Sequence, residues 1–126
     1  MQQLQFEAAW KKALSAQDRN IIEHIFDETK DHCDSPVVFS PIREAINHKK
    51  DLLVTVLVHN FTDYPLTFEN TQLVYSNEQE VLAEYNFTLP ALQIPPHVST
   101  PWTLIFPTDS YTAVSSLWNG HVEIRK

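Results

Sequence analysis

The stretch that decides the fold runs from Leu52 to Pro107 and reads LLVTVLVHNFTDYPLTFENTQLVYSNEQEVLAEYNFTLPALQIPPHVSTPWTLIFP. Apolar β-forming residues come in short runs, and clusters of Asn, Asp or Pro close each run. Short strands separated by such turn residues are typical of a small antiparallel sandwich. We therefore expect a mainly β, immunoglobulin-like antiparallel sandwich of about six or seven strands.

Within this stretch, residues 52–59 are nearly all apolar, which predicts a central strand that is covered on both faces. A short strand is expected at residues 66–68, and residues 72–76 and 81–88 predict a hairpin. Period-2 alternation on its second strand turns one set of side chains toward the core. The members of that set are Val81, Ala83, Tyr85 and Phe87.

The remainder of the stretch is punctuated by proline. Residues 89–96 are expected to cross between the two sheets, and residues 99–106 form the next strand, with Trp102, Leu104 and Phe106 on one face. Beyond it, we expect a loop or short helix at residues 108–116. A last strand is expected at residues 118–124.

Upstream, residues 37–46 predict a first strand that Pro41 confines to a sheet edge or a bulge, because proline cannot donate to the ladder. Residues 6–14 and 21–26 show apolar spacing of three and four, which indicates one bent helix or a helical hairpin with Ser15 as N-cap. We expect a single domain, in which residues 1–30 pack as a helical element on a sandwich formed by residues 37–126.

The charge of the chain is unevenly distributed. The 126 residues carry a net charge of −7, yet Asp51 to Ile124 contains no Lys or Arg. Phosphate backbones and anionic lipids require clustered cations, so nucleic acid and membrane surfaces are excluded as expected partners. A protein with a basic surface is the natural complement of the acidic half. Solubility of a β-domain is the simpler explanation of the same acids.

The numbers of cysteines and glycines limit which disulfides and which functional motifs the chain can contain. Cys33 is the only cysteine, so no intramolecular disulfide can form. The first ten residues do not resemble a signal peptide, and no apolar run is long enough to span a bilayer, so we expect a cytoplasmic protein. Gly120 is the only glycine, which excludes a glycine-rich phosphate loop, a dinucleotide fingerprint and a nucleophile elbow.

The order of several motifs resembles the SLAP domain, found in firmicute S-layer assembly proteins linked to an accessory Sec secretion system. The similarity extends from Trp10, through VTVLVHN at 54–60 and VLAEYNFTLP at 81–90, to IPPHVSTPWTLIFP at 94–107. The resemblance implies an accessory role in S-layer protein secretion or assembly. The residues that match the motif are Trp10, Asn60, Tyr75, Phe87, Ile94, Pro95, Ser99, Pro101, Trp102 and Phe106.

These motif residues have a structural interpretation of their own. Asn60 can bond to neighbouring backbone and hold the exit of a strand into a turn. Pro101 sets an extended entry, after which Trp102 can bury about 150–250 Å² in the core. We therefore expect the motif to close the sandwich rather than to contact a ligand.

No catalytic or cofactor site is expected. Residues 31–34 offer Asp, His, Cys and Asp, but adjacent residues seldom converge on one ion, and Cys33 has no recognisable base. His59, at the end of the central strand, is interpreted as a hydrogen-bonded structural histidine. The sequences Asn60-Phe61-Thr62 and Asn86-Phe87-Thr88 match the glycosylation pattern by chance.

A binding surface remains the main functional expectation. Phe61 and Tyr64 lie in a predicted turn, where they can contact a partner or fold down as a lid; the acidic candidates are Glu78, Glu80 and Glu84. We expect a non-enzymatic protein-interaction module that binds a secretion component or an exported passenger. The alternatives are a structural β-domain that forms a homodimer through an edge strand, and a small hydrolase or ligand-binding domain.

Overall fold

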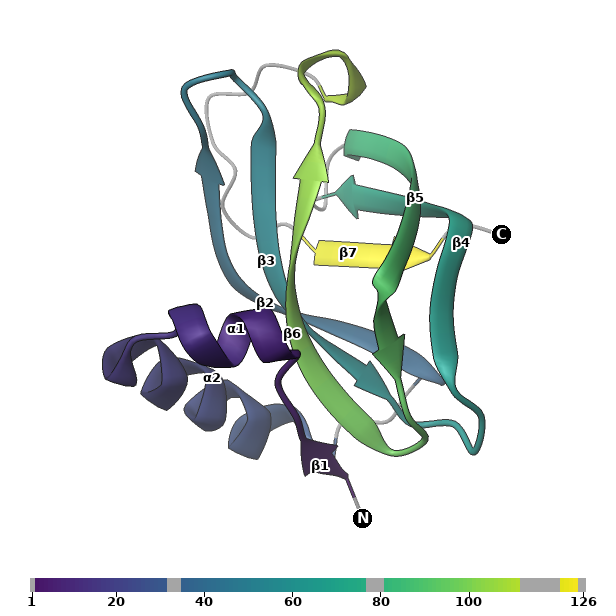
Figure 1. Ribbon diagram of the computed structural model, residues 1–126. Coiled ribbons are helices and arrows are strands. Elements are labelled where there is room, and N and C mark those ends of the chain that lie inside the picture. The colour runs from purple at the N-terminus through teal and green to yellow at the C-terminus, as the bar shows by residue number, and fades with distance from the viewer. Residues whose placement is uncertain (1, 32–34, 77–80, 112–120, 125–126) are drawn as a thin grey trace.

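The computed structural model describes residues 2–31, 35–76, 81–111 and 121–124. Two β-sheets pack face to face, and two helices lie against the outside of one of them (Figure 1). The first sheet has the strand order β1-β6-β3-β2, and the second has the order β5-β4-β7. The expected mainly β sandwich is thereby confirmed. The strands are β1 (Gln3–Leu4), β2 (Val37–Ile46), β3 (Leu52–Asn60), β4 (Leu66–Ser76), β5 (Val81–Ile94), β6 (Val98–Phe106) and β7 (His121–Ile124).

The predicted central strand is central in the first sheet. β3 pairs antiparallel with β2 on one side and with β6 on the other. Its side chains from Val54 to Asn60 are all buried, because the second sheet covers one face and the helices cover part of the other. β1 is a two-residue strand at the other edge of this sheet, and it pairs parallel with the start of β6. No apolar pattern in the sequence predicted it.

Pro41 lies on an edge strand and also beside a bulge, as predicted. β2 is the outer strand of its sheet, and its register with β3 shifts between Pro41 and Arg43. A bulge adds one residue to one strand and so reverses which side chains face the core. Beyond it, Glu44 faces the sandwich interior, whereas Arg43 and Ala45 face outward with their partners on β3.

The second sheet corrects two predictions. Residues 66–68 and 72–76 belong to one bent strand, because Asn70 adopts a left-handed conformation (φ 51°) at a bulge instead of ending the strand. Residues 89–94, expected as a crossing, continue β5 as far as Ile94. Pro90 is tolerated there because β5 is an edge strand, where a missing N–H need not break a ladder.

The predicted inward set of β5 is only half correct. Ala83 and Phe87 are buried, but Val81 and Tyr85 are exposed. The register of β4 with β5 shifts next to Ser76, and Leu82 takes the place in the core that Val81 was expected to fill. Tyr85 lies against the edge of the Phe87 ring, at a sheet edge that no further strand covers in the described part of the chain.

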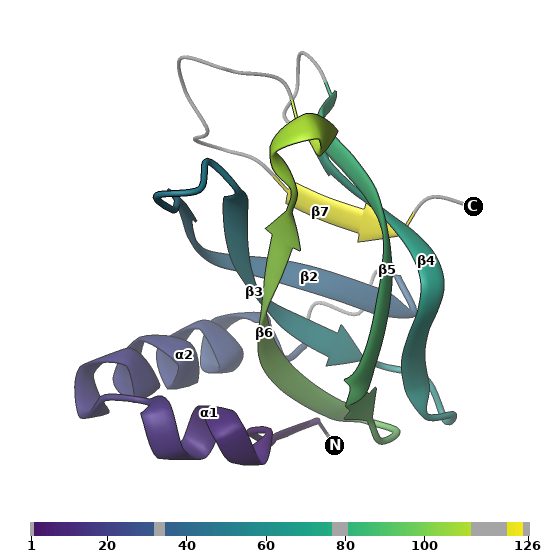
Figure 2. The same ribbon diagram turned by 45° about the horizontal axis from the view of Figure 1, so that its top comes forward.

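The N-terminal element is a helical hairpin. α1 (Ala8–Ala13) leads into α2 (Ala16–Thr29), and Ser15 is the N-cap of α2, since its Oγ accepts a hydrogen bond from the Asp18 amide at 3.1 Å. Ile22 is fully buried where α2 packs on β2 and β3. Both views place the hairpin near one end of these strands, away from the β2–β3 turn (Figures 1 and 2).

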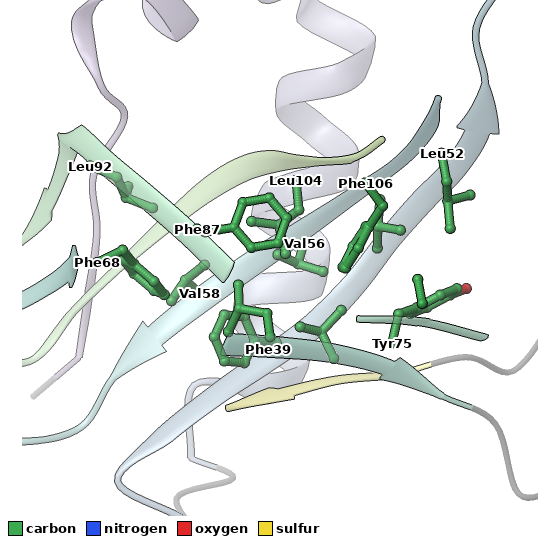
Figure 3. Close-up of a cluster of buried hydrophobic side chains, with 14 of the residues drawn as sticks. Phe39, Leu52, Val56, Val58, Phe68, Tyr75, Phe87, Leu92, Leu104 and Phe106 are labelled. Atoms are coloured by element: carbon green, nitrogen blue, oxygen red, sulfur yellow. The ribbon is translucent and has the colours of Figure 1, made fainter. Parts of the chain in front are cut away.

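The core lies between the two sheets. Side chains from β2, β3, β4, β5 and β6 converge there (Figure 3). The Phe106 ring contacts the Phe87 ring edge-on, with centroids 5.1 Å apart, and lies 6.5 Å from the Tyr75 ring. Trp102 is only half-buried and packs against the margin of this cluster.

Because side chains alternate between the two faces of β6, alanine substitutions at two neighbouring residues should differ strongly in their effect on stability. We expect Phe106→Ala to lower the free energy of unfolding by about 3–5 kcal/mol, because it empties a fully buried ring position. The exposed neighbour Ile105 is the matched control, and Ile105→Ala should change it by less than about 0.5 kcal/mol. Urea unfolding followed by tryptophan fluorescence measures both, and equal losses would contradict the described packing.

Candidate functional site

Asn60 joins the two sheets at the end of β3. Its side chain is fully buried, and its amide nitrogen lies 2.8 Å from the Tyr64 carbonyl, 3.1 Å from that of Ile94 and 3.2 Å from that of Pro95. Its Oδ1 accepts hydrogen bonds from the amide and hydroxyl of Thr62. The amide thus shapes the β3–β4 turn and also fastens it to the end of β5, which goes beyond the predicted strand exit.

His59, the preceding residue, points to the opposite face of the sheet, toward the helices. The imidazole is fully buried, with Nδ1 2.6 Å from Ser99 Oγ and Nε2 2.8 Å from Thr29 Oγ1 and 3.1 Å from Ser40 Oγ. These hydroxyls belong to β6, α2 and β2. The expected hydrogen-bonded histidine is therefore confirmed, and it links the helix to three strands.

The neighbours of these hydroxyls indicate the direction of the hydrogen bonds. Gln2 Nε2 donates to Ser99 Oγ at 3.0 Å, which leaves the serine hydrogen for His59 Nδ1. Thr29 Oγ1 donates to the Ile25 carbonyl at 2.6 Å, which leaves its lone pairs for an Nε2–H donor. The Thr29 contact thus fits a hydrogen on His59 Nε2 that points to Thr29 Oγ1.

Two aromatic rings cover this imidazole. The Phe61 ring is parallel to it, with centroids 5.3 Å apart, and the Phe26 ring is stacked at 6.4 Å. The two turn aromatics thus differ in role. Phe61 folds down as a lid on His59, whereas Tyr64 stays 74% exposed at the tip of the turn.

The remaining motif residues are mostly part of the sandwich. Tyr75, Phe87, Ile94 and Phe106 are buried in the core, and Ser99 and Pro101 are buried on the other face of β6. Pro95 is exposed, but its carbonyl accepts from Asn60. Trp10 is the exception, because it lies on α1, outside the core cluster.

The polar candidates do not gather into one site. Glu78 and Glu80 lie outside the described residues, as do three of the four residues at 31–34. Glu84 is exposed on the outer face of the second sheet, where its carboxylate accepts a hydrogen bond from Gln72 Nε2 at 3.0 Å. Among the described residues, no group of three or more His, Cys, Asp or Glu side chains could hold a metal ion.

A surface pocket lies where the helical hairpin meets β2, and sequence reasoning missed it. Its volume is about 340 Å³, and its lining is mostly apolar. Arg43 Nη2 forms an ion pair with Asp18 Oδ1 at 3.1 Å on this lining, and both side chains are partly exposed. The residues that line the pocket are Trp10, Ala13, Leu14, Asp18 and Arg43. Nothing local in the sequence relates α1 to Arg43, since the bulge at Pro41 is what turns that side chain outward.

The same bulge turns Glu44 inward, where the Tyr75 hydroxyl donates to its Oε2. Burial raises the pKa of the Glu44 carboxyl above its usual value, because the ionised form loses hydration. An inward-facing acid on an edge strand also discourages that edge from pairing with another chain.

Fold and site together define a class of protein: a β-sandwich domain with an N-terminal helical hairpin and a pocket at their junction. The family model of the SLAP domain matches residues 4–119. The chain therefore belongs to the SLAP domain family, as the motif resemblance indicated. No curated protein and no solved structure matches the chain. In the described part of the chain, none of the helices is both apolar and long enough to cross a membrane.

The Asn60 contacts predict a large loss on truncation. Asn60→Ala should lower the free energy of unfolding by about 1–3 kcal/mol, because the buried Ile94 carbonyl loses its donor. Asn86, an exposed asparagine on β5, is the control, and Asn86→Ala should be nearly neutral. Chemical denaturation measures the free energy of unfolding of both variants. If Asn60→Ala is as stable as Asn86→Ala, the hydrogen bonds of Asn60 do not stabilise the junction of the two sheets.

The Glu44 environment predicts a pH-dependent variant. A carboxyl whose pKa is raised by folding stabilises the fold at low pH and loses that contribution as the pH rises through the folded pKa. Glutamine cannot ionise, so Glu44→Gln does not lose this contribution. As the pH rises from 4 to 7, the free energy of unfolding of Glu44→Gln should therefore increase relative to that of the wild type. Urea titrations across this range measure the difference, with Glu69→Gln, at an exposed site on β4, as control. A difference for Glu44→Gln that does not vary with pH would contradict the assignment.

Proposed function

We propose that this SLAP domain is a non-enzymatic protein-interaction module that acts, on the cytoplasmic side, as an accessory factor in the secretion and assembly of S-layer proteins. Family membership supports the biological setting. The observation that carries the proposal is the pocket at the junction of the hairpin and β2. Trp and Arg are enriched among residues that dominate protein interfaces, and here Trp10 and Arg43 line one apolar recess.

The buried polar residues support a structural rather than a catalytic role. Ser99 Oγ and His59 Nδ1 are as close as a nucleophile and its base, but both residues are fully buried. A substrate would have to displace Phe61 and part of the helical hairpin to reach them. The hydrogen bonds of this pair instead connect β3, β6 and α2.

Self-association through an edge strand is the second candidate. β2 is the edge of its sheet, which favours it. Pro41, the bulge beside it and the inward Glu44 are features that natural edge strands use against pairing, so we rank it lower. Light scattering over a concentration series tests it: a dimer that Val37→Pro dissociates would favour this candidate, because the register places the Val37 N–H on the free edge of β2.

A photo-crosslinking experiment tests the leading proposal. A photoreactive phenylalanine analogue replaces Ala13, an exposed residue of the pocket lining, in cells that export S-layer proteins. We expect crosslinks to secretion components or S-layer precursors, and Arg43→Glu should reduce them. Tyr85 on the opposite sheet is the control position. If neither position crosslinks to such proteins above the untreated sample, the proposal is wrong.

A further inference from the structure

The helical hairpin leaves part of the outer face of the first sheet uncovered. Residues paired directly across β6, β3 and β2 share a face. Near the helices, the row that contains His59 and Ser99 is fully buried. Toward the β2–β3 turn, a second buried row follows, formed by Pro101, Leu57 and Ser40. After it come the row of Thr103, Thr55 and Arg43, and then the row of Ile105, Leu53 and Ala45. Figures 1 and 2 both show this end of the strands projecting away from the hairpin.

The last of these rows is apolar and accessible. Ile105 is 51% exposed, Ala45 is exposed and Leu53 is half-buried. The row lies one side-chain step beyond Arg43, about 7 Å along the strand, and so continues directly from the pocket. We call this continuous surface, from the pocket lining through the apolar row to the β2–β3 turn, the outer strip.

Cations stand at both ends of the apolar row. Arg43 lies at the pocket end, and Lys49 and Lys50 are exposed in the β2–β3 turn at the other. Among the described residues, neither lysine lies within salt-bridge distance of a carboxylate. The nearby carboxylate of Asp51 is engaged by other groups, since its Oδ1 accepts from the Thr108 amide and its Oδ2 faces the Asn47 side-chain amide.

This placement contrasts with the charge of the whole chain. The net charge is −7, and neither Lys nor Arg occurs between Asp51 and Ile124. Three of the nine basic residues nevertheless flank one apolar row. Three cations about an apolar centre are too few and too dispersed for a phosphate backbone or a lipid surface. They fit a short protein segment whose carboxylates lie on either side of apolar side chains.

We propose that the outer strip binds an extended segment of a partner protein, with a short apolar centre and acidic residues on both sides. Arg43 exchanges its contact with Asp18 for a carboxylate of the segment, or shares it. The apolar centre covers Ile105 and Leu53, and the second acidic group meets Lys49 and Lys50. From Arg43 to the turn at Asn47 the strand rises about 13 Å, which an extended segment spans with about four residues. This inference rests on the proposed function and names the chemistry of its partner.

Fluorescence anisotropy with defined peptides tests the inference. One probe carries three central leucines between two pairs of aspartates, and its matched probe carries lysines in place of the aspartates. We expect the acidic probe to bind at least about tenfold more tightly than the basic one. Arg43→Glu and Ile105→Asp should each weaken the acidic probe by about tenfold or more. Tyr85→Asp, at an exposed aromatic of the second sheet, should not.

Several results would overturn the inference. These are an acidic probe that does not bind, equal binding of both probes, or unchanged affinity in Arg43→Glu and Ile105→Asp. A homodimer that Ile105→Asp dissociates would assign the strip to a second copy instead. Thermal melts confirm that each variant folds, as the exposure of both side chains predicts.

The peptide-binding and crosslinking experiments together separate failure of this inference from failure of the proposed function. If the peptides do not bind while Ala13 still crosslinks to secretion components, the outer strip is wrong and the interaction role stands. If the acidic peptide binds but no position crosslinks to the secretion pathway, the strip stands and the S-layer setting is wrong.

Discussion

The packing of the helices and the two sheets depends on the buried hydrogen bonds of two residues at the end of β3, His59 and Asn60. His59 and Asn60 are adjacent, so their side chains leave the strand on opposite faces. His59 bonds to hydroxyls on α2, β2 and β6, and Asn60 bonds to carbonyls in the β3–β4 turn and at the end of β5. Two consecutive polar residues at the end of a mostly apolar strand thus connect the helical layer and both sheets. Because both are fully buried, each must be satisfied, and this requirement specifies how the layers dock.

Local patterns in the sequence were sufficient for the order and type of most elements. The apolar run of residues 52–59 predicted a central strand, Pro41 an edge strand or a bulge, and Ser15 a helix N-cap. The central strand and the N-cap are present, and at Pro41 both alternatives are found. These patterns act over a few residues, through burial on two faces, a missing N–H donor and a capping oxygen. The family motif could also be recognised from the sequence. Most of its residues are buried in the sandwich, as expected from their structural interpretation.

What the sequence could not predict depends on register and on distant contacts. The bulges shift the inward set from Val81 to Leu82 and reverse the faces of Arg43 and Glu44, although simple alternation suggests otherwise. Asn70 is a turn residue by composition, but here it bends a strand that continues. The pocket joins Trp10 and Arg43, thirty-three positions apart, and no periodicity within either element relates them.

The bulge at Pro41 therefore affects both the edge of the first sheet and the surface beside the pocket. It protects an edge strand, and through the same change of register it places an acid inside and a guanidinium outside. A regular β2 would put Glu44 in solvent and Arg43 against the core, where an unpaired guanidinium is costly. The exposed side chain of Arg43 then borders both the helical pocket and the apolar row of Ile105 and Leu53. A feature that natural edge strands use against pairing thus also gives this face a charged group next to accessible apolar surface.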